Sequence, residues 1–533
     1  MIRSIHARAA AAVRRLSTKP YYVTTPIYYV NAEPHIGHLH SNVLADVLAR
    51  YAALRHSGPA QLATGTDEHG MKIQRTAEAR GEDPRALCDR VSGRFRALAD
   101  KCGMAYTHFT RTTDARHVAA VTHFWDTLAR NGFLYVGRHE GWYAVSDEAF
   151  YPESQVRRVE LPSGEVVHEA VESGHRVEWM AEDNYKFRMA ALRAPLLAWL
   201  ERSPDVIQPR ALYEHVLAEV RAGLADLSVS RPRARLHWGV PVPGDPAHTI
   251  YVWVDALVNY LTAAGYPDVG GGAWPADVHV VGKDIIRFHA VYWPALLLAA
   301  GLPLPRQLIA HGHWTVERAK MSKSRGNSVD PFAAIDTFGV DAVRFFLMRV
   351  GGNIGADADY SAVHLAEFQR KFLQGQLGNL LSRVLAPKIQ ARLHPLARDG
   401  VLPAAAPSAL HDALRALPGA FDMHMRRYEI ARALAAAFDV IGAANERVQH
   451  AAPWAADTPV HVVHAAVYDT VETLRIVGVL LAPFMPVPMA RLLDLVGAAP
   501  HERTWAALGG LRTHIPLRTA PGKIAPLFPR VAA

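Results

Sequence analysis

Cysteine is almost absent from this chain of 533 residues, which contains only Cys88 and Cys102. Two cysteines cannot form a disulfide framework, and they exclude a zinc site built mainly of cysteines. Long apolar runs are missing as well. The longest, at about residues 476–490, is short and contains three prolines, so we expect no membrane-spanning segment.

Acidic residues are absent from the start of the chain, where the first acid is Glu33. Residues 1–20 hold five basic side chains and two serines, and on a helix the basic side chains would lie beside a small apolar stripe. This composition is typical of a mitochondrial transit peptide, although a frayed basic terminus would look similar. We expect residues 1–19 to be removed and the mature protein to reside in the mitochondrial matrix. That segment carries five of the eight net positive charges, so charge alone does not predict nucleic-acid binding.

Strands alternate with helices along much of the chain. Short apolar runs such as residues 278–282 (VHVVG) and 307–312 (QLIAHG) are typical of buried strands, and residues 40–54 have apolar positions at helical spacing. This alternation predicts an α/β fold with a parallel sheet, whose ligands bind at the carboxyl ends of the strands. A chain of this length is too long for one core, so we expect several domains.

Two regions depart from the alternation. Residues 137–230 are richer in acids, aromatic residues and turn residues, which indicates a domain inserted into the α/β fold. After about residue 360 the apolar spacing becomes helical and stays so to about residue 498, with residues 386–408 expected to form a loop.

A His-Ile-Gly-His motif occupies residues 35–38, directly after an expected strand and before an expected helix. A helix N-terminus presents free amide hydrogens and the positive end of the helix dipole, which suits a phosphate. His35 and His38 lie one turn apart and can face the same ligand, and Gly37 lets a flat base approach the backbone. Taken alone, the motif could be two surface histidines at the start of a helix.

A second motif, Lys320-Met321-Ser322-Lys323-Ser324, places two amines three residues apart. Together with residues 35–38, it resembles to the letter the signature pair of the class I aminoacyl-tRNA synthetases. The resemblance implies that the partner of these lysines is ATP, with Mg²⁺ on its triphosphate. Lys323, supported by Lys320, would stabilise the negative charge that builds up on the departing pyrophosphate.

Longer blocks narrow the resemblance to the methionyl-tRNA synthetase family, in its bacterial and mitochondrial branch. These blocks are VTTPIYYVNAEPHIGHLH, ATGTDEHGMKIQ, YVWVDALVNYL, VGKDIIRFHAVYWPA and HWTVERAKMSKSRGN, within a similarity from about residue 21 to about 500. The resemblance implies that L-methionine and ATP form methionyl-adenylate and pyrophosphate, and that methionine then passes to tRNA-Met. It also implies a Rossmann-like catalytic domain (20–136 and 231–317), an inserted connective-peptide domain (137–230), a stem-contact fold (318–375) and an α-helical anticodon-binding domain (376–533).

The resemblance assigns site residues at the matching positions of this chain. The methionine site would comprise Ile27, Tyr29, Trp253, Ala256, Tyr260, Ile285 and His289, with Asp67 pairing the substrate ammonium. The ATP site would comprise His35, Gly37, His38, Asp284, Lys320 and Lys323. Arg231 would handle the substrate carboxylate, and the catalytic set would be His35, His38, Lys320, Lys323, Asp67 and Arg231. A thioether packs well against aromatic rings, which fits the methionine site. Without the resemblance, Trp253 and Tyr260 would be interpreted as core residues.

One departure from the family concerns metal. Zinc-bearing relatives have paired cysteines in the inserted domain, and the positions that match one such pair are Ala144 and Asp147. The two cysteines of this chain lie elsewhere. We therefore expect no metal site and no structural zinc, and an inserted domain held together by packing alone.

The helical C-terminal part contains the expected RNA contacts. Asn379 and Arg383 are spaced i and i+4, so they share a helix face, and Trp454 follows a proline. In the family these positions read the CAU anticodon, and single-stranded bases are recognised by aromatic stacking and edge hydrogen bonds. Outside the family, a solvated arginine and a packed tryptophan would explain the same pattern. No further domain is evident after about residue 500, so a monomer is the simpler expectation.

Other functions share some of these features. A cysteinyl enzyme would need zinc ligands that are missing, and the leucyl, isoleucyl and valyl enzymes carry a larger insertion than residues 137–230. A catalytically inactive paralogue that only binds tRNA would not need His35, His38, Asp67, Lys320 and Lys323 together. A nucleotidyltransferase with a similar histidine motif would not need the helical C-terminal part.

Overall fold

The computed structural model of this chain describes residues 19–145, 148–151, 153–161, 163–171, 173–268, 272–320, 328–517 and 525–529. The chain divides into two compact units. The first unit comprises residues 1–34, 60–100 and 105–310, and the second comprises residues 35–59, 101–104 and 311–533. Residues 1–18 of the expected transit peptide, Asp147 and Lys323 lie outside the described residues.

A parallel sheet organises the first unit. Its strands are β1 (Tyr21–Tyr29), β2 (Ala60–Asp67), β3 (His108–Arg111), β9 (Ile207–Gln208), β14 (Val278–Gly282) and β15 (Leu308–His311). They run in the order β3–β2–β1–β14–β15–β9, and the pairs β2–β3, β1–β2, β1–β14 and β15–β9 are parallel. This arrangement confirms the expected α/β fold. Tyr29 at the end of β1 is in register with Asp67 at the end of β2, so both side chains stand at the carboxyl edge of the sheet.

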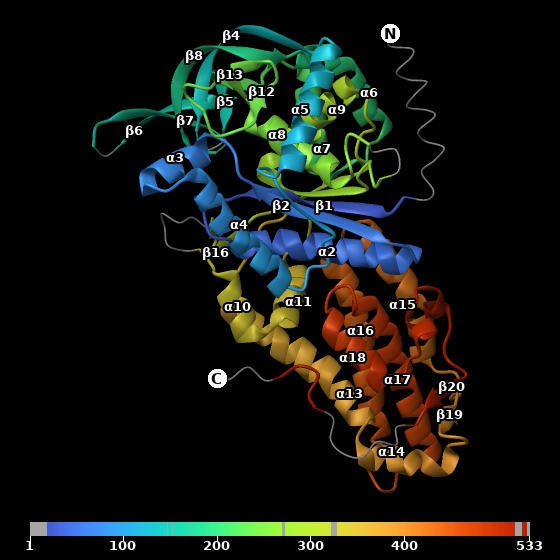
Figure 1. Cartoon of the computed structure of the whole chain (residues 1–533). Helices are drawn as coiled ribbons and strands as arrows, with labels where there is room; N and C mark the ends of the chain where they lie inside the picture. The colour runs from blue at the N-terminus through green and yellow to red at the C-terminus, as the bar shows by residue number, and fades with distance from the viewer. Residues whose placement is uncertain are drawn as a thin grey trace. The chain divides into compact units, whose positions relative to one another are not determined.

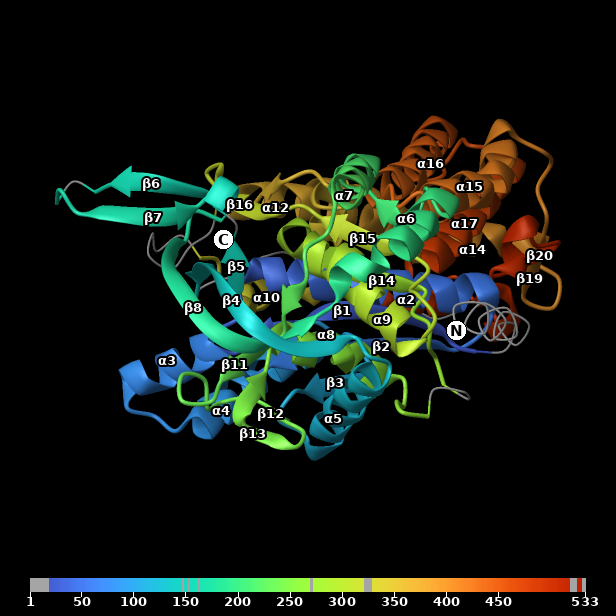
Figure 2. The same ribbon diagram turned by 90° about the horizontal axis from the view of Figure 1, so that it is seen from above.

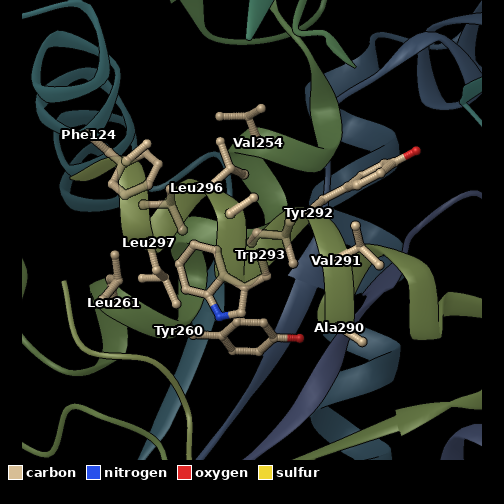
Figure 3. Packing of buried hydrophobic residues seen from close by; sticks show 14 of the residues in the cluster. Phe124, Val254, Tyr260, Leu261, Ala290, Val291, Tyr292, Trp293, Leu296 and Leu297 are labelled. Carbon is tan, nitrogen blue, oxygen red and sulfur yellow. The ribbon is translucent and has the colours of Figure 1, made fainter. Parts of the chain in front are cut away.

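The helices of the first unit follow the strands in the chain. They are α3 (Met71–Arg80), α4 (Pro84–Lys101), α5 (Ala115–Arg130), α6 (Arg193–Arg202), α7 (Arg210–Ala222), α8 (Val252–Ala263) and α9 (Trp293–Ala300). The main core gathers apolar side chains from α5, α8 and α9, and Figure 3 shows Trp293 among Phe124, Leu296, Leu297 and Tyr260. Trp293 is fully buried, so this packing fixes the position of α8 and α9.

An antiparallel sheet accounts for most of the expected inserted domain. Its strands are β4 (Leu134–Ala144), β5 (Ala149–Tyr151), β6 (Val156–Glu160), β7 (Val166–Ala170) and β8 (Arg176–Phe187), in the order β5–β4–β8–β7–β6. Figure 2 shows the long β4–β8 pair and the β6–β7 hairpin beyond it. β10 (Leu227–Ser228) pairs with β8, and a small sheet of β11 (Ser230–Pro232), β12 (Pro241–Val242) and β13 (Asp245–Ile250) leads into α8.

The second unit begins with α2 (Ile36–His56) and continues after β15. A small sheet of β16 (Trp314–Val316), β17 (Ala319–Lys320) and β18 (Ala358–Asp359) accompanies α10 (Pro331–Phe338), α11 (Val340–Val350) and α12 (Ala362–Phe368). The π-helix η6 (Gln369–Gly378) leads into α13 (Asn379–Val384), α14 (Pro387–Leu393), α15 (Ala409–Arg426), α16 (Ile430–Ala451), α17 (Val460–Leu481) and α18 (Pro486–Leu495). Figure 1 shows α15, α16, α17 and α18 packed side by side, which confirms the helical prediction.

The expectation that residues 386–408 form a loop is partly wrong. They contain α14 and also β19 (Val401–Pro403), which pairs with β20 (His514–Pro516). Pro387 stands in the first turn of α14, where it is compatible with a helix, and Ile389 and Leu393 share its buried face. Separately, none of the helices among the described residues is both long enough and apolar enough to cross a membrane.

Candidate active site

The residues expected around methionine all come from the first unit. Ile27 and Tyr29 lie at the end of β1, and Asp67 is the last residue of β2. Trp253, Ala256 and Tyr260 lie on α8 at i, i+3 and i+7, which places them on one helix face. Ile285 and His289 follow β14, in the short helices η3 (Lys283–Ile285) and η4 (Phe288–Tyr292). We call these eight residues the methionine site.

A hydrogen-bonded pair of side chains forms one side of this group. The Tyr260 hydroxyl lies 2.7 Å from Nε2 of His289, whose Nδ1 lies 3.0 Å from the carbonyl oxygen of Ile285. Both side chains are about 1% exposed. Burial lowers the pKa of His289 to about 4, so its imidazole is neutral at neutral pH. The pair therefore offers an uncharged polar surface, which suits a thioether better than a charged side chain.

Stacked aromatic rings form another side. The indole of Trp253 lies over the ring of Phe288, with centroids 3.7 Å apart and planes within 9°. Phe288 begins the π-helix η4, an irregular turn of a kind that often occurs at functional sites. Pro294 follows this turn and has no amide hydrogen for a regular helical bond. Phe288 was not among the residues expected from the sequence, although its position directly before His289 could have indicated a place in the same site.

Three buried polar atoms of the methionine site have no hydrogen-bond partner within the described part of the chain. They are the hydroxyl of Tyr29, Oδ1 of Asp67 and Nε1 of Trp253. A buried polar atom without a partner costs about 1–3 kcal/mol, so such atoms are uncommon in folded proteins. Their occurrence together, next to apolar and aromatic side chains, is what a site for a small amphipathic ligand requires.

Asp67 sits in an environment that disfavours its charge. The side chain is 4% exposed, and burial is the main cause that raises its pKa well above the usual 3.8. The carboxylates of Asp255 and Glu148 raise the pKa of Asp67 further, while a hydrogen bond from the backbone of His69 opposes them. A cationic ligand group would remove this penalty, because an opposite charge favours the ionised form.

A buried His–Asp–His cluster links α8 to the segment after β2. The carboxylate of Asp255 lies 2.7 Å from Nδ1 of His69 and 2.7 Å from Nε2 of His117. Nδ1 of His117 lies 2.9 Å from the hydroxyl of Thr262, which is also on α8. Asp255 is two residues from Trp253 and His69 is two residues from Asp67, so the cluster holds two parts of the methionine site in register.

Arg231 occupies an aromatic cage. Its guanidinium lies 4.7 Å from the ring of Tyr251, 4.8 Å from Phe150 and 5.1 Å from Tyr143. Its Nη1 donates to the hydroxyl of Ser228 at 3.0 Å and to the carbonyl of Ser230 at 2.7 Å. The side chain is 1% exposed, and its Nε has no hydrogen-bond partner among the described residues. The assigned role toward the substrate carboxylate stays a prediction.

The histidine motif begins α2 in the second unit. His35 is the N-cap residue, and its Nδ1 accepts from the amide of Gly37 at 3.1 Å. Nδ1 of His38 accepts from the amide of His35 at 3.1 Å, and the two rings stack with centroids 3.8 Å apart. A Cβ on Gly37 would lie 2.9 Å from the His35 ring, so only glycine leaves room for this stack. The two histidines lie at the start of the helix as expected, and their role toward ATP stays a prediction.

Two further residues expected at ATP, Asp284 and Lys320, lie within the described part of the chain. Asp284 is exposed in η3, and its carboxylate folds over Gly282, where an added Cβ would lie 2.5 Å from it. Lys320 is the last residue of β17, paired with Thr315 of β16. Lys320 ends a strand and Asp284 follows one by two residues, and ligand contacts are common at such positions in α/β folds.

The expected anticodon residues lie close together in the second unit. The guanidinium of Arg383, on α13, stands 5.5 Å from the ring centre of Trp454. Trp454 lies in the turn between α16 and α17 and is 38% exposed, which is unusual for so large an apolar side chain. Asn379 begins α13 directly after the π-helix η6. An exposed indole beside an arginine is a surface on which a base can stack.

Metal ligands do not gather within the described residues: no group of three or more histidine, cysteine, aspartate or glutamate side chains there could hold an ion. Ala144, at a position that matches a metal ligand in zinc-bearing relatives, is fully buried and packs with Ala170 and Val177. At Ala144, therefore, apolar packing stands where those relatives have a metal ligand.

Comparisons with known proteins agree with this geometry. A family model described as tRNA synthetases class I (M) matches residues 21–385. A probable mitochondrial methionine–tRNA ligase of Neurospora crassa is 46% identical over 508 residues, which cover 91% of this chain and 81% of that protein. The mitochondrial methionine–tRNA ligase of Homo sapiens is 43% identical over 507 residues, covering 91% and 85%. The structure of Mycobacterium tuberculosis methionyl-tRNA synthetase in complex with methionyl-adenylate matches with a TM-score of 0.88 at 38% identity, covering 96% of this chain and 100% of that one.

Proposed function

Because this chain belongs to the class I tRNA synthetases of the methionine type, we propose that the methionine site binds the amino-acid substrate. The protein is a methionine–tRNA ligase that uses ATP. The observation that carries the proposal is the set of three unpartnered buried atoms at the ends of β1, β2 and the start of α8. Asp67 would take the ammonium of methionine, and Trp253, Phe288 and Tyr260 would surround the thioether.

The first step needs no nucleophile from the protein. A carboxylate oxygen of methionine attacks the α-phosphorus of ATP, and pyrophosphate leaves with its electron pair. His35, Gly37 and His38 would bind the phosphates at the start of α2, and Asp284 would contact ATP from η3. Lys320 and Lys323 would meet the charge that grows on the leaving group, with Mg²⁺ on the triphosphate as part of the substrate. Arg231 would act on the methionine carboxylate.

The second step transfers the methionyl group to tRNA-Met. A hydroxyl at the 3′ end of the tRNA attacks the carbonyl carbon of the adenylate, and AMP leaves. Trp454 would stack on a base of the CAU anticodon, while Asn379 and Arg383 would bond to base edges. The exposed indole beside Arg383 supports this assignment.

Several finer proposals accompany this function. The protein is mitochondrial like its relatives, and we place it in the matrix after loss of residues 1–19. The inserted domain (137–230) would need no zinc, and residues 318–375 and 376–533 would form the stem-contact fold and the anticodon-binding domain. A monomer would suffice, because all eight residues of the proposed methionine site belong to the first compact unit of one chain.

The test of the site is a pair of variants, Asp67→Ala and Lys323→Ala, in methionine-dependent ATP–pyrophosphate exchange. Asp67→Ala should abolish methionine binding, because the ammonium loses the carboxylate proposed to pair with it. Lys323→Ala should slow adenylate formation steeply while equilibrium binding of methionine stays nearly intact. Equal losses of binding and rate for Lys323→Ala would contradict the role assigned to that lysine. Unchanged methionine binding for Asp67→Ala would contradict the site.

A further inference from the structure

Glu148 is a buried acid in the connection between β4 and β5 of the inserted sheet. Its side chain is 1% exposed, which is rare for glutamate. Its backbone has φ of 52°, in the left-handed region where glutamate is uncommon and strained. Burial and a strained backbone together make this glutamate a candidate for a specific role of its carboxylate.

The carboxylate binds the start of α3. Oε1 of Glu148 accepts from the backbone amide of Lys72 at 2.6 Å, in the first turn of that helix. The N-cap residue, Gly70, has no side chain to cap the helix, and the first turn contains no acid of its own. A Cβ on Gly70 would lie 3.0 Å from Oε1 of Glu148. Glu148 therefore supplies from another part of the chain the negative charge that a helix N-terminus favours.

The same carboxylate binds the inserted sheet. Its Oε2 accepts from the hydroxyl of Tyr143 at 2.6 Å, near the end of β4. The ring of Tyr143 lies under Arg231 and under Arg235, at 5.1 Å and 4.8 Å. Both carboxylate oxygens are thus bonded, one to α3 and one to β4. Glu148 joins the inserted sheet to the helix that begins four residues after Asp67.

Glu148 also acts on the methionine site electrostatically. After burial and Asp255, its charge is the next cause that raises the pKa of Asp67, with a smaller effect from Glu68. Burial is the main cause that raises the pKa of the Tyr29 hydroxyl, in β1, and the charges of Asp67 and Glu148 raise this pKa further. Glu148 itself faces Tyr143 on β4, Lys72 on α3 and Arg231 on β11; burial raises its pKa, and these groups oppose the rise.

We propose that Glu148 is a positioning residue for methionine binding, through which the inserted domain holds the Asp67–Gly70 turn in place. By capping α3 it fixes the end of that turn, and its nearby charge sets how readily Asp67 accepts a cation. The residue does not touch substrate in this account. The inference rests on the proposed role of Asp67 toward the methionine ammonium.

The experiment compares three full-chain proteins in ATP–pyrophosphate exchange: Glu148→Ala, Glu148→Gln and the control Glu165→Gln. Glu165 lies in the same inserted domain, is exposed, and pairs only at the surface with Arg176. Loss of one capping bond and one charge should raise the KM for methionine about tenfold in Glu148→Ala, with the KM for ATP within about twofold of the original. The control should match the original protein in both constants.

Glu148→Gln separates positioning from general support of the fold. Its amide oxygen can still accept from the amide of Lys72, so the KM for methionine near neutral pH should recover most of the loss. Because the negative charge near Asp67 is gone, the rise of this KM on acidification should begin at lower pH than in the original protein.

Two results would overturn the proposal. One is a methionine KM that changes less than about twofold in Glu148→Ala. The other is a methionine KM that begins to rise on acidification at the same pH in Glu148→Gln and in the original protein. This second result is decisive even if Glu148→Ala does not fold. Failure of the methionine site itself would look different, because Asp67→Ala would then retain methionine binding whatever Glu148 does.

Discussion

At the residue scale, we expect the ionisation of Asp67 to govern how methionine binding depends on pH. Burial, Asp255 and Glu148 hold its pKa above the usual value in the empty site, whereas a bound ammonium needs the ionised form. Where the pH lies below the raised pKa of the empty site, methionine should therefore bind with release of a proton from Asp67. Below the pKa of the empty site, each pH unit of acidification should weaken binding about tenfold.

The measurement is the methionine dissociation constant, determined by calorimetry in buffers of different ionisation enthalpy as the pH is lowered. Proton release should appear as a buffer-dependent heat, and affinity should fall at pH values where an ordinary aspartate would still be ionised. Glu165→Gln should show the same profile, since its side chain is exposed. Affinity that is flat down to about pH 4 would refute the electrostatic account of Asp67.

The residues that sequence reasoning found and missed differ in a physical way. The resemblance located His35, Asp67, Trp253 and Tyr260, because each lies within a contiguous motif of the sequence. Glu148 acts through contacts with residues 143 and 72, and the second of these is far along the chain. Such a long-range contact leaves no local pattern in the sequence, and only the folded chain reveals it.

At the element scale, the His69–Asp255–His117 cluster ties α8 to the segment after β2. Burial disfavours the charge of Asp255, but its interactions with His69 and His117 outweigh burial and lower its pKa to about 2. An acid whose pKa falls on folding stabilises the native state above its unfolded pKa, and this contribution disappears as the pH falls through the folded value. The shift corresponds to about 2 kcal/mol, lost between about pH 4 and about pH 2.

Asp255→Asn should remove this contribution. We expect the free energy of unfolding near neutral pH to fall by about 2 kcal/mol, and its acid dependence between pH 4 and about pH 2 to flatten. Denaturant unfolding of the variant and the original protein over this pH range measures both effects. A variant that keeps its stability at neutral pH, or loses it with the original acid dependence, would contradict the role of the cluster.

A second prediction at this scale concerns α13 and the turn between α16 and α17, which bring Arg383 to Trp454. Trp454→Ala should weaken charging of tRNA-Met by roughly 1–3 kcal/mol of lost stacking while leaving methionyl-adenylate formation unchanged. Aminoacylation and pyrophosphate exchange, assayed on the same preparation, separate the two steps. Charging at the original efficiency would refute the anticodon assignment.

Helical periodicity predicted most of the second unit well, since its long helices bury continuous apolar faces. It failed at residues 386–408, where α14 is short and rich in basic residues and β19 is three residues long. Elements of this length carry too few apolar positions to show a period, and tertiary contacts such as the β19–β20 pair decide them.

At the scale of the whole molecule, the residues proposed to bind methionine and those proposed to bind the anticodon belong to separate regions of the chain. The methionine site belongs to the first unit, and Trp454 and Arg383 belong to the second. Composition alone predicted neither, because the chain is ordinary in hydrophobic content and charge. The class of the fold followed from the alternation of strands and helices, whereas the substrate followed from the resemblance of long sequence blocks to one family.

The most direct measurement of this account is ATP–pyrophosphate exchange with each proteinogenic amino acid in turn, on protein lacking residues 1–18. The account predicts exchange with methionine alone and its loss in Asp67→Ala. Exchange with another amino acid would keep the reaction class and contradict the methionine site. No exchange with any amino acid would contradict the adenylation mechanism for the free protein, and would point to an enzyme that needs tRNA before activation or to a tRNA-binding paralogue.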